Sequence, residues 1–158
     1  GALDERHAVA TPASSTSDEA VMRRVRQLVR ERIQPVHPLE PSIRGVSHVL
    51  WADRPKGAGA DARNAVFYGE GAIDRSPCGT GTSARMAQLV AQGKLRQGDR
   101  FVHESYIGSQ FIGRVEEEVQ LAGHPAIVPS IEGSARVTGM NTLWIDDADP
   151  LWRGFQVL

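Results

Sequence analysis

The residues best suited to chemistry lie in the stretch "DRSPCGTGTSAR", residues 74–85, which holds the only cysteine of the chain, Cys78. Glycine and hydroxyl residues follow Cys78 and lead into a segment with helical spacing. The unpaired N–H groups at the start of a helix attract anions and favour the thiolate form of a cysteine. The stretch therefore predicts a thiol base at position 78.

The neighbours of Cys78 indicate which ligand such a base would meet. Gly79 leaves the backbone amides open to a carboxylate, and the hydroxyls of Thr80 and Thr82 add donors. Asp74 precedes the cysteine and suits an ammonium group on the same ligand. Together these groups would bind the carboxylate and the ammonium group of an α-amino acid. The alternative is a buried structural cysteine beside a tight turn.

Two helices are expected to frame this stretch. Thr16 and Glu19 have capping-box spacing, and apolar residues then recur on one helical face, at Val21, Val25, Leu28, Val29 and Ile33. A second helix is predicted over residues 83–95. Its nearly all-round apolar character is typical of a buried helix, and Cys78 is expected just before it.

Short strands are expected around the second helix, giving an α+β fold with a mostly antiparallel sheet. Residues 46–52 and 65–68 flank a Gly-rich loop and predict a hairpin. Further β-prone runs follow at 101–108, 110–121, 126–133, 134–139 and 140–146. The charges of "VEEEV" fall on both faces of its run, which predicts an edge strand or a hairpin tip. Residues 1–18 are expected to be a linker or edge segment, and 19–158 one domain.

Composition narrows the function classes. The 158 residues are 41% hydrophobic with a net charge of -1, which suits one soluble domain and argues against nucleic acid and anionic membranes as partners. A single cysteine forms no internal disulfide and suits a reducing compartment, so a cytoplasmic location is expected. The five histidines are scattered, and no metal site is predicted. His103 is expected to be an ordinary satisfied strand residue, with a supporting role at the site as the alternative.

The stretch around Cys78 resembles the second active-site motif of the proline racemase family. The resemblance extends over "RNAVFYGEGAIDRSPCGTGTSARMA", "ESYIGSQFIGRV" and "GSARVTGMNTLWIDDADPLWRGF", in that order. It implies two similar lobes of the diaminopimelate-epimerase type, each with a sheet curled around a central helix and the ligand between them. Residues 19–158 resemble the C-terminal catalytic lobe.

The resemblance implies an isomerase that needs no cofactor. One cysteine removes the α-proton of the amino acid and a second cysteine, from the other lobe, returns a proton to the opposite face. Carried over by position, Cys78 is one of these two groups, Asp74 binds the amine, and the amides of Gly79 and Thr80 hold the carboxylate. Tyr68 stands about where the family often places an aromatic against the ring; the alternative is that the neighbouring Phe67 is the inward residue and Tyr68 lies on the strand surface.

The chain departs from the family pattern in one respect. The Cys-Gly-His motif of the first lobe is absent, and the length is about half of the family's. The expected partner is therefore an N-terminal lobe with the second cysteine, and the chain alone is expected to be inactive. Cysteine rather than threonine at position 78 favours racemisation or epimerisation over dehydration.

The substrate stays open between proline and 4-hydroxyproline, with 4-hydroxyproline favoured because such enzymes are more frequent. A diaminopimelate epimerase is an alternative within the same fold. An alternative from another class is a non-catalytic lobe that binds a small ligand or a protein, including a second copy of itself in a homodimer.

Overall fold

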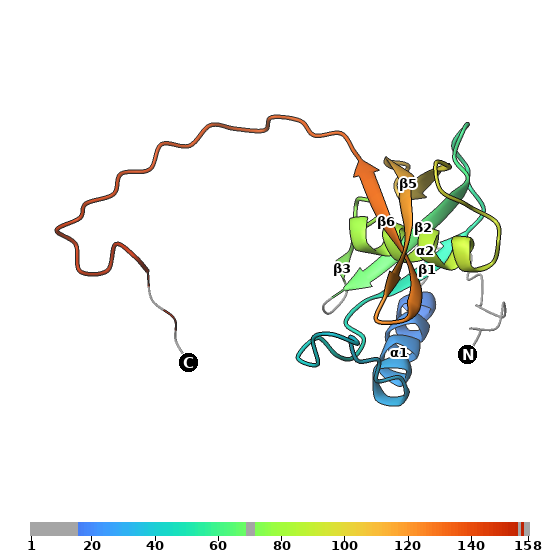
Figure 1. Cartoon of the computed structure of the whole chain (residues 1–158). Helices are drawn as coiled ribbons and strands as arrows, with labels where there is room; N and C mark the ends of the chain where they lie inside the picture. The colour runs from blue at the N-terminus through green and yellow to red at the C-terminus, as the bar shows by residue number, and fades with distance from the viewer. Residues whose placement is uncertain (1–15, 69–71, 155, 157–158) are drawn as a thin grey trace.

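The computed structural model describes residues 16–68, 72–154 and 156 of the chain. Within these ranges, two helices and a sheet form an α+β fold (Figure 1). The helices are α1 (Thr16–Arg32) and α2 (Gly79–Ala91). The strands are β1 (Val49–Asp53), β2 (Ala62–Tyr68), β3 (Ala72–Ile73), β4 (Arg100–Ser105), β5 (Gln110–Leu121) and β6 (His124–Glu132).

The sheet runs in the order β1-β2-β4-β5-β6, with β3 also paired to β2. It is mixed, because β2 and β4 are parallel while the other pairings are antiparallel. The hairpin predicted from residues 46–52 and 65–68 is confirmed as β1 and β2, which pair from Val49 with Phe67 to Asp53 with Arg63. The predicted α+β class is confirmed.

Strand β2 lies inside the fold because both of its faces are covered. Alternate side chains of a strand point to opposite faces, and the residues from Arg63 to Phe67 are all buried. Ala65 and Phe67 pack with Met22 of α1. On the other face, Asn64 contacts the loop that leads into α2. Strand β2 therefore lies between the two helices.

Helix α1 covers its face of the sheet with a different residue from the one expected. Met22 is buried against Ala65 and Phe67, with Trp51 packed alongside. Val21, predicted to point inward, is 56% exposed, and Ile33 is also exposed. Val25, Leu28 and Val29 of the predicted stripe are half-buried, whereas Met22 replaces Val21 as the residue that contacts the sheet at the amino end of the helix. The predicted capping box involves side chains outside those described.

Helix α2 begins at Gly79 rather than at residue 83, and it ends at Ala91 rather than at residue 95. Cys78 caps its start, and Gly93 follows its end with a φ of 69°. One face is buried, with Met86 and Leu89 against Phe101 and Val115 of the sheet. The expectation of a helix buried all round is wrong, since Ala84 and Ala91 are exposed.

Strands β5 and β6 continue beyond β4 as a two-stranded ribbon (Figure 1). Only residues 110–114 of β5 pair with β4, whereas pairing with β6 continues to Leu121. The three glutamates of "VEEEV" are exposed on this ribbon. At this run β5 pairs with β6 alone, so the predicted alternative of an edge strand is confirmed, whereas the tip of the hairpin lies at Ala122 and Gly123.

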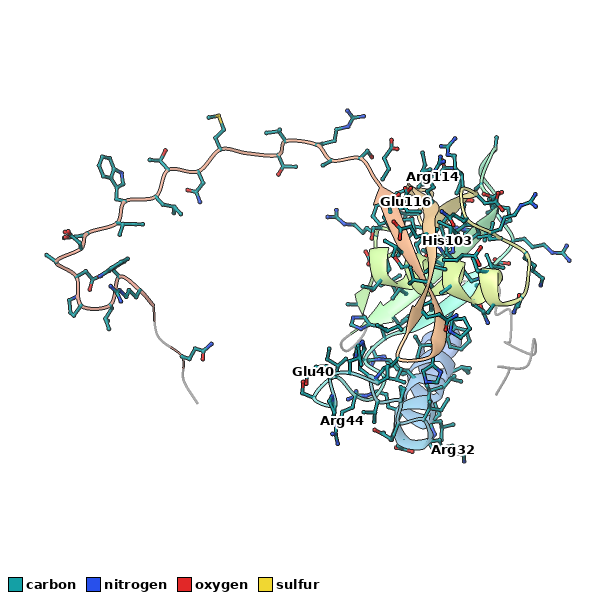
Figure 2. The ribbon with its side chains drawn as sticks, in the orientation of Figure 1. Arg32, Glu40, Arg44, His103, Arg114 and Glu116 are labelled. Atoms are coloured by element: carbon teal, nitrogen blue, oxygen red, sulfur yellow. The ribbon has the colours of Figure 1, made fainter. Side chains whose placement is uncertain are left out.

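The segment after β6 leaves the body as an extended tail (Figure 1). The strands predicted at 134–139 and 140–146 are wrong, because this segment has no neighbouring strand to pair with in the described structure. Its large apolar side chains face solvent: Trp144 is 93% exposed and Met140 is fully exposed. Figure 2 shows the side chains of the tail projecting outward along its length. No helix in the described ranges is long and apolar enough to cross a membrane.

Candidate active site

Cys78 holds the position directly before α2, in a backbone conformation that few L residues adopt. Its φ is 63° and its ψ is 117°. Residues held in such sparsely populated regions cost about 1–3 kcal/mol and persist only when the surroundings enforce them. The surroundings of Cys78 are therefore expected to hold this residue through several contacts.

The sulfur of Cys78 serves as the N-cap of α2. Sγ accepts a hydrogen bond from the backbone N–H of Gly81 at 3.3 Å and lies 3.4 Å from the hydroxyl oxygen of Thr80. A Cβ at position 81 would lie 2.9 Å from Leu50 Cδ1 and 3.3 Å from Sγ, so a larger residue there would displace the Leu50 side chain and crowd the sulfur. The half-buried sulfur thus lies within hydrogen-bond distance of one backbone N–H and one hydroxyl.

Asp74 is connected to Cys78 through Ser76. The carboxylate oxygen Oδ1 of Asp74 accepts hydrogen bonds from the backbone N–H of Ser76 at 2.8 Å and from its hydroxyl at 2.9 Å. The same hydroxyl oxygen accepts the backbone N–H of Cys78 at 3.1 Å. One oxygen of Asp74 therefore braces the loop, in addition to the ligand-binding role predicted for this residue.

The carbonyl of Pro77 is held from the opposite side by two buried side chains. Asn64 Nδ2 donates to it at 2.7 Å and the hydroxyl of Thr82 at 3.2 Å. Thr82 is fully buried, so the expectation that its hydroxyl would serve a ligand is wrong. The helix turn that begins at Cys78 directs Thr82 inward instead.

His103 completes this buried group of polar side chains. Its Nδ1 lies 3.1 Å from Asn64 Nδ2 and 3.0 Å from the hydroxyl of Thr82, inside the body near α2 (Figure 2). Burial, with a smaller effect from the positive charge of Arg85, lowers the pKa of His103 to about 4. Its Nε2 and the Oδ1 of Asn64 have no hydrogen-bond partner among the described residues. The imidazole is therefore neutral at physiological pH.

A third contact holds the loop at Arg75. The hydroxyl of Ser109 donates to the carbonyl of Arg75 at 2.6 Å, and Ser105 Oγ lies 2.7 Å from Ser109 Oγ. Residues of β2, of β4 and of the turn after β4 thus all hold the loop before Cys78. Sequence reasoning weighed a supporting role for His103 only as an alternative and missed Asn64, Ser105 and Ser109; the one available signal was the polar pair Arg63 and Asn64 within a β-prone run.

The other predicted ligand-binding residues, Gly79, Thr80 and Tyr68, differ in the element to which they belong. Gly79 and Thr80 form the first turn of α2, whose N–H groups find no acceptor within the helix. A Cβ built at Gly79 would meet no other atom within 4 Å, apart from its neighbours along the chain and its own helix. Tyr68 ends β2 and pairs with Ala72, and its side chain lies outside those described. Phe67 points into the core against α1.

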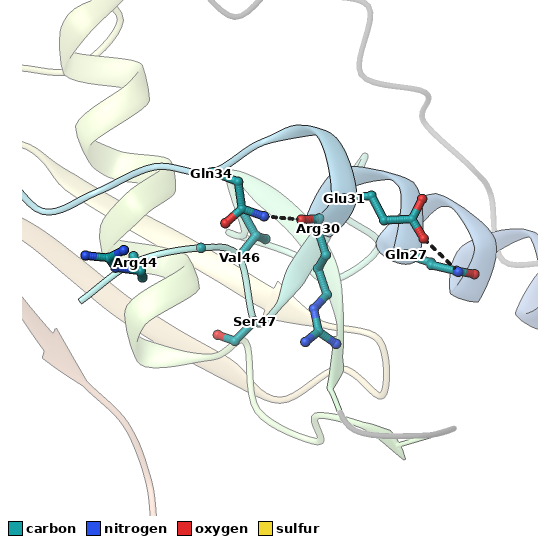
Figure 3. Close-up of a pocket in the computed structure, with 8 residues that line it drawn as sticks. Gln27, Arg30, Glu31, Gln34, Arg44, Val46 and Ser47 are labelled. Atoms are coloured by element: carbon teal, nitrogen blue, oxygen red, sulfur yellow. Dashed lines mark hydrogen bonds between the residues drawn. The ribbon is translucent and has the colours of Figure 1, made fainter. Parts of the chain in front are cut away.

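A polar hollow of about 550 Å³ lies elsewhere, between the second half of α1 and residues 44–47 (Figure 3). Its lining includes Arg30, Gln34 and Arg44 but none of the predicted site residues. No group of three or more potential metal ligands occurs within the part of the chain that the structure describes.

Comparison with known proteins agrees with the motif. The family model described as proline racemase matches residues 10–156. The 4-hydroxyproline epimerase of Brucella ovis is 62% identical over 133 residues, which are 84% of this chain and 40% of the relative. The 4-hydroxyproline 2-epimerase of Brucella suis has the same identity and coverage.

A solved structure with the same fold is the hydroxyproline epimerase of Agrobacterium vitis with bound trans-4-hydroxy-L-proline. It matches with a TM-score of 0.70 and 38% identity, over 85% of this chain and 38% of that chain. The chain thus spans about 40% of the length of the curated relatives it matches.

Proposed function

This chain belongs to the proline racemase family, and we propose that it carries one half of the active site of a 4-hydroxyproline epimerase. The observation that carries the proposal is the placement of Cys78. A half-buried thiol lies at the amino end of a helix, accepts a backbone N–H, and is kept in a costly conformation by its surroundings.

In the proposed reaction, Cys78 and a second cysteine act on opposite faces of the substrate. The thiolate removes the α-proton, so that the Cα–H bond breaks and an S–H bond forms. The electron pair stays on Cα and spreads into the carboxylate. The thiol on the opposite face then gives its proton to Cα, which inverts the centre. No oxidant, reductant or external acid is needed.

The groups around the sulfur have distinct roles in this proposal. The first-turn amides of Gly79 and Thr80 bind the carboxylate and stabilise the charge that develops on it as the proton leaves. Asp74 binds the amine with the part of its carboxylate that Ser76 does not occupy, and Tyr68 packs against the ring. The open space in front of Gly79 supports this assignment, because a ligand can approach the backbone there.

The second cysteine belongs, in this proposal, to an N-terminal lobe of the same design, a sheet curled around a helix. The tail after β6 supports a partner of this kind. Val137, Leu143, Trp144 and Ile145 are each more than 70% exposed, and burying such side chains is favourable. We propose that they pack against the other lobe. A cytoplasmic location is part of the same proposal, because a working thiol suits a reducing compartment.

The substrate assignment follows the named relatives. The two Brucella proteins are 4-hydroxyproline epimerases, and the Agrobacterium vitis protein was solved with trans-4-hydroxy-L-proline bound. We therefore place 4-hydroxyproline ahead of proline.

The experiment is deuterium exchange at Cα of trans-4-hydroxy-L-proline in heavy water, followed by NMR. The complete protein with its N-terminal lobe is expected to exchange and invert the substrate, whereas the 158-residue chain is expected to do neither. Cys78→Ala and Cys78→Ser in the complete protein are expected to lose inversion. Full turnover by the 158-residue chain, or by Cys78→Ala, would contradict the two-cysteine mechanism.

A further inference from the structure

The peptide unit between Pro77 and Cys78 is held at both of its polar ends. Its carbonyl accepts hydrogen bonds from Asn64 at 2.7 Å and Thr82 at 3.2 Å, and its N–H donates to Ser76 Oγ at 3.1 Å. The plane of this unit sets the direction in which the chain enters Cys78, and hence its φ. The groups that fix this peptide plane therefore also fix the direction in which Sγ points.

The orientation of the Asn64 amide follows from its partners. The Pro77 carbonyl only accepts hydrogen bonds, so the amide nitrogen must face it. The same nitrogen lies 3.1 Å from Nδ1 of His103, which must then accept as well. This assigns the neutral tautomer with its proton on Nε2. With Nδ1 as an acceptor, the single proton of the Thr82 hydroxyl is shared between Nδ1, at 3.0 Å, and the Pro77 carbonyl, at 3.2 Å.

Packing of the core alone does not explain why Asn64, Thr82 and His103 are buried together. Asn64, Thr82 and His103 are each at most 2% exposed, in a region where apolar side chains would pack without polar atoms. His103 Nε2 and Asn64 Oδ1 lack hydrogen-bond partners among the described residues, which costs stability. Polar groups retained at such a cost need another reason, and their shared target, the carbonyl before Cys78, supplies one.

We propose that Asn64, Thr82 and His103 form a positioning unit that holds Cys78 in its strained conformation and aims its sulfur at the substrate. The unit acts through Pro77 and does not touch the reacting atoms. His103 orients Asn64 and Thr82, and these two residues hold the carbonyl. The inference rests on the proposed role of Cys78 as the acid/base group.

The test uses Thr82→Val, which removes the hydroxyl and keeps the shape, and His103→Phe, which keeps a ring without the acceptor. Thr82→Ser restores the hydroxyl as the conservative variant. Val115→Ala is the matched control, because Val115 is equally buried but packs in the cluster around Met86, away from Pro77. All variants are compared at temperatures where each is fully folded.

The first readout is the alkylation rate of Cys78 by iodoacetamide, which is unambiguous because this chain has one cysteine. Thr82→Val and His103→Phe are expected to change the rate by about tenfold, equivalent to about 1.4 kcal/mol. Thr82→Ser and Val115→Ala are expected to keep the wild-type rate. Equal changes in all four variants, or none in any, would overturn the proposal.

The second readout is the kinetics of the complete protein with trans-4-hydroxy-L-proline. Thr82→Val is expected to lower kcat with little change in KM, because the groups proposed to bind substrate are untouched, and Thr82→Ser is expected to restore kcat. A fall in kcat for Val115→Ala as large as that for Thr82→Val would show a merely structural role. If the wild-type protein lacks epimerase activity, the proposed function fails, while the alkylation result still decides whether the unit positions Cys78.

Discussion

The substitution Gly79→Ala separates ligand binding from folding at this site. A Cβ built at position 79 meets no other atom within 4 Å beyond its chain neighbours and its own helix. Alanine is also a better helix residue than glycine by about 1 kcal/mol at most in this context. The free energy of unfolding is therefore expected to stay unchanged or to rise slightly.

The same methyl group would occupy the space through which a carboxylate reaches the first-turn amides. A hydrogen bond to a charged group contributes about 1.5–3 kcal/mol, so the loss of one such bond raises KM for trans-4-hydroxy-L-proline about 10- to 100-fold. Initial rates by chiral chromatography and urea unfolding of the complete protein measure the two effects. Gly81→Ala is the comparison variant, because its Cβ would lie 2.9 Å from Leu50 Cδ1 and 3.3 Å from Sγ and would therefore crowd the thiol instead of the path of the carboxylate. A stable Gly79→Ala variant with wild-type kcat and KM would refute the placement of the carboxylate.

Three further outcomes test the conformation of Cys78, the buried histidine and the tail. Cys78→Gly is expected to be about 1 kcal/mol more stable than Cys78→Ala in urea unfolding, because only glycine adopts a positive φ without strain; equal stabilities would argue against the strained conformation. Since the pKa of His103 falls to about 4 in the fold, the unfolded state binds the extra proton as pH drops below about 6.5, and the histidine is expected to cost about 2 kcal/mol between pH 7 and 5. His103→Gln should lose this dependence, and an unchanged slope in that variant would contradict the assignment. Trp144→Ala is expected to change the stability of the 158-residue chain by less than about 0.5 kcal/mol and that of the complete protein by about 3 kcal/mol; equal small effects in both would mean that Trp144 does not pack against another lobe.

Elements defined by local patterns could be predicted from the sequence. The β1–β2 hairpin and the β5–β6 ribbon follow from short alternating runs separated by turn residues. The start of α2 could not be predicted, because cysteine is an unusual N-cap and its positive φ follows from contacts with distant residues. The runs at 134–139 and 140–146 have strand-like composition, but a strand forms only with a pairing partner, and the described structure offers none to them.

The candidate site likewise has one part that could be predicted from the sequence and one part that could not. Cys78 and its neighbours along the chain were identifiable from a contiguous motif. The residues that hold the motif were not, because they are remote in sequence: Asn64 lies 13 positions before Pro77, and His103 lies 21 positions after Thr82. Their convergence depends on the parallel pairing of β2 with β4, which sets Ala62 beside His103. Alternation within each strand predicts a face but does not give this register.

This parallel pairing explains why a strained cysteine can be maintained at all. The chain runs from β2 through β3 and helix α2 to β4, so the loop before the helix starts at β3, beside β2, and Thr82 near the start of the helix contacts His103 of β4. Asn64 on β2 and Thr82 on the helix both reach the Pro77 carbonyl, and His103 on β4 contacts these two side chains. A loop anchored by only one of these elements would be free to relax to a negative φ at Cys78. The conformation of Cys78 thus depends on β2, β4 and α2 together. A change in any one of these elements is expected to alter the position of Sγ.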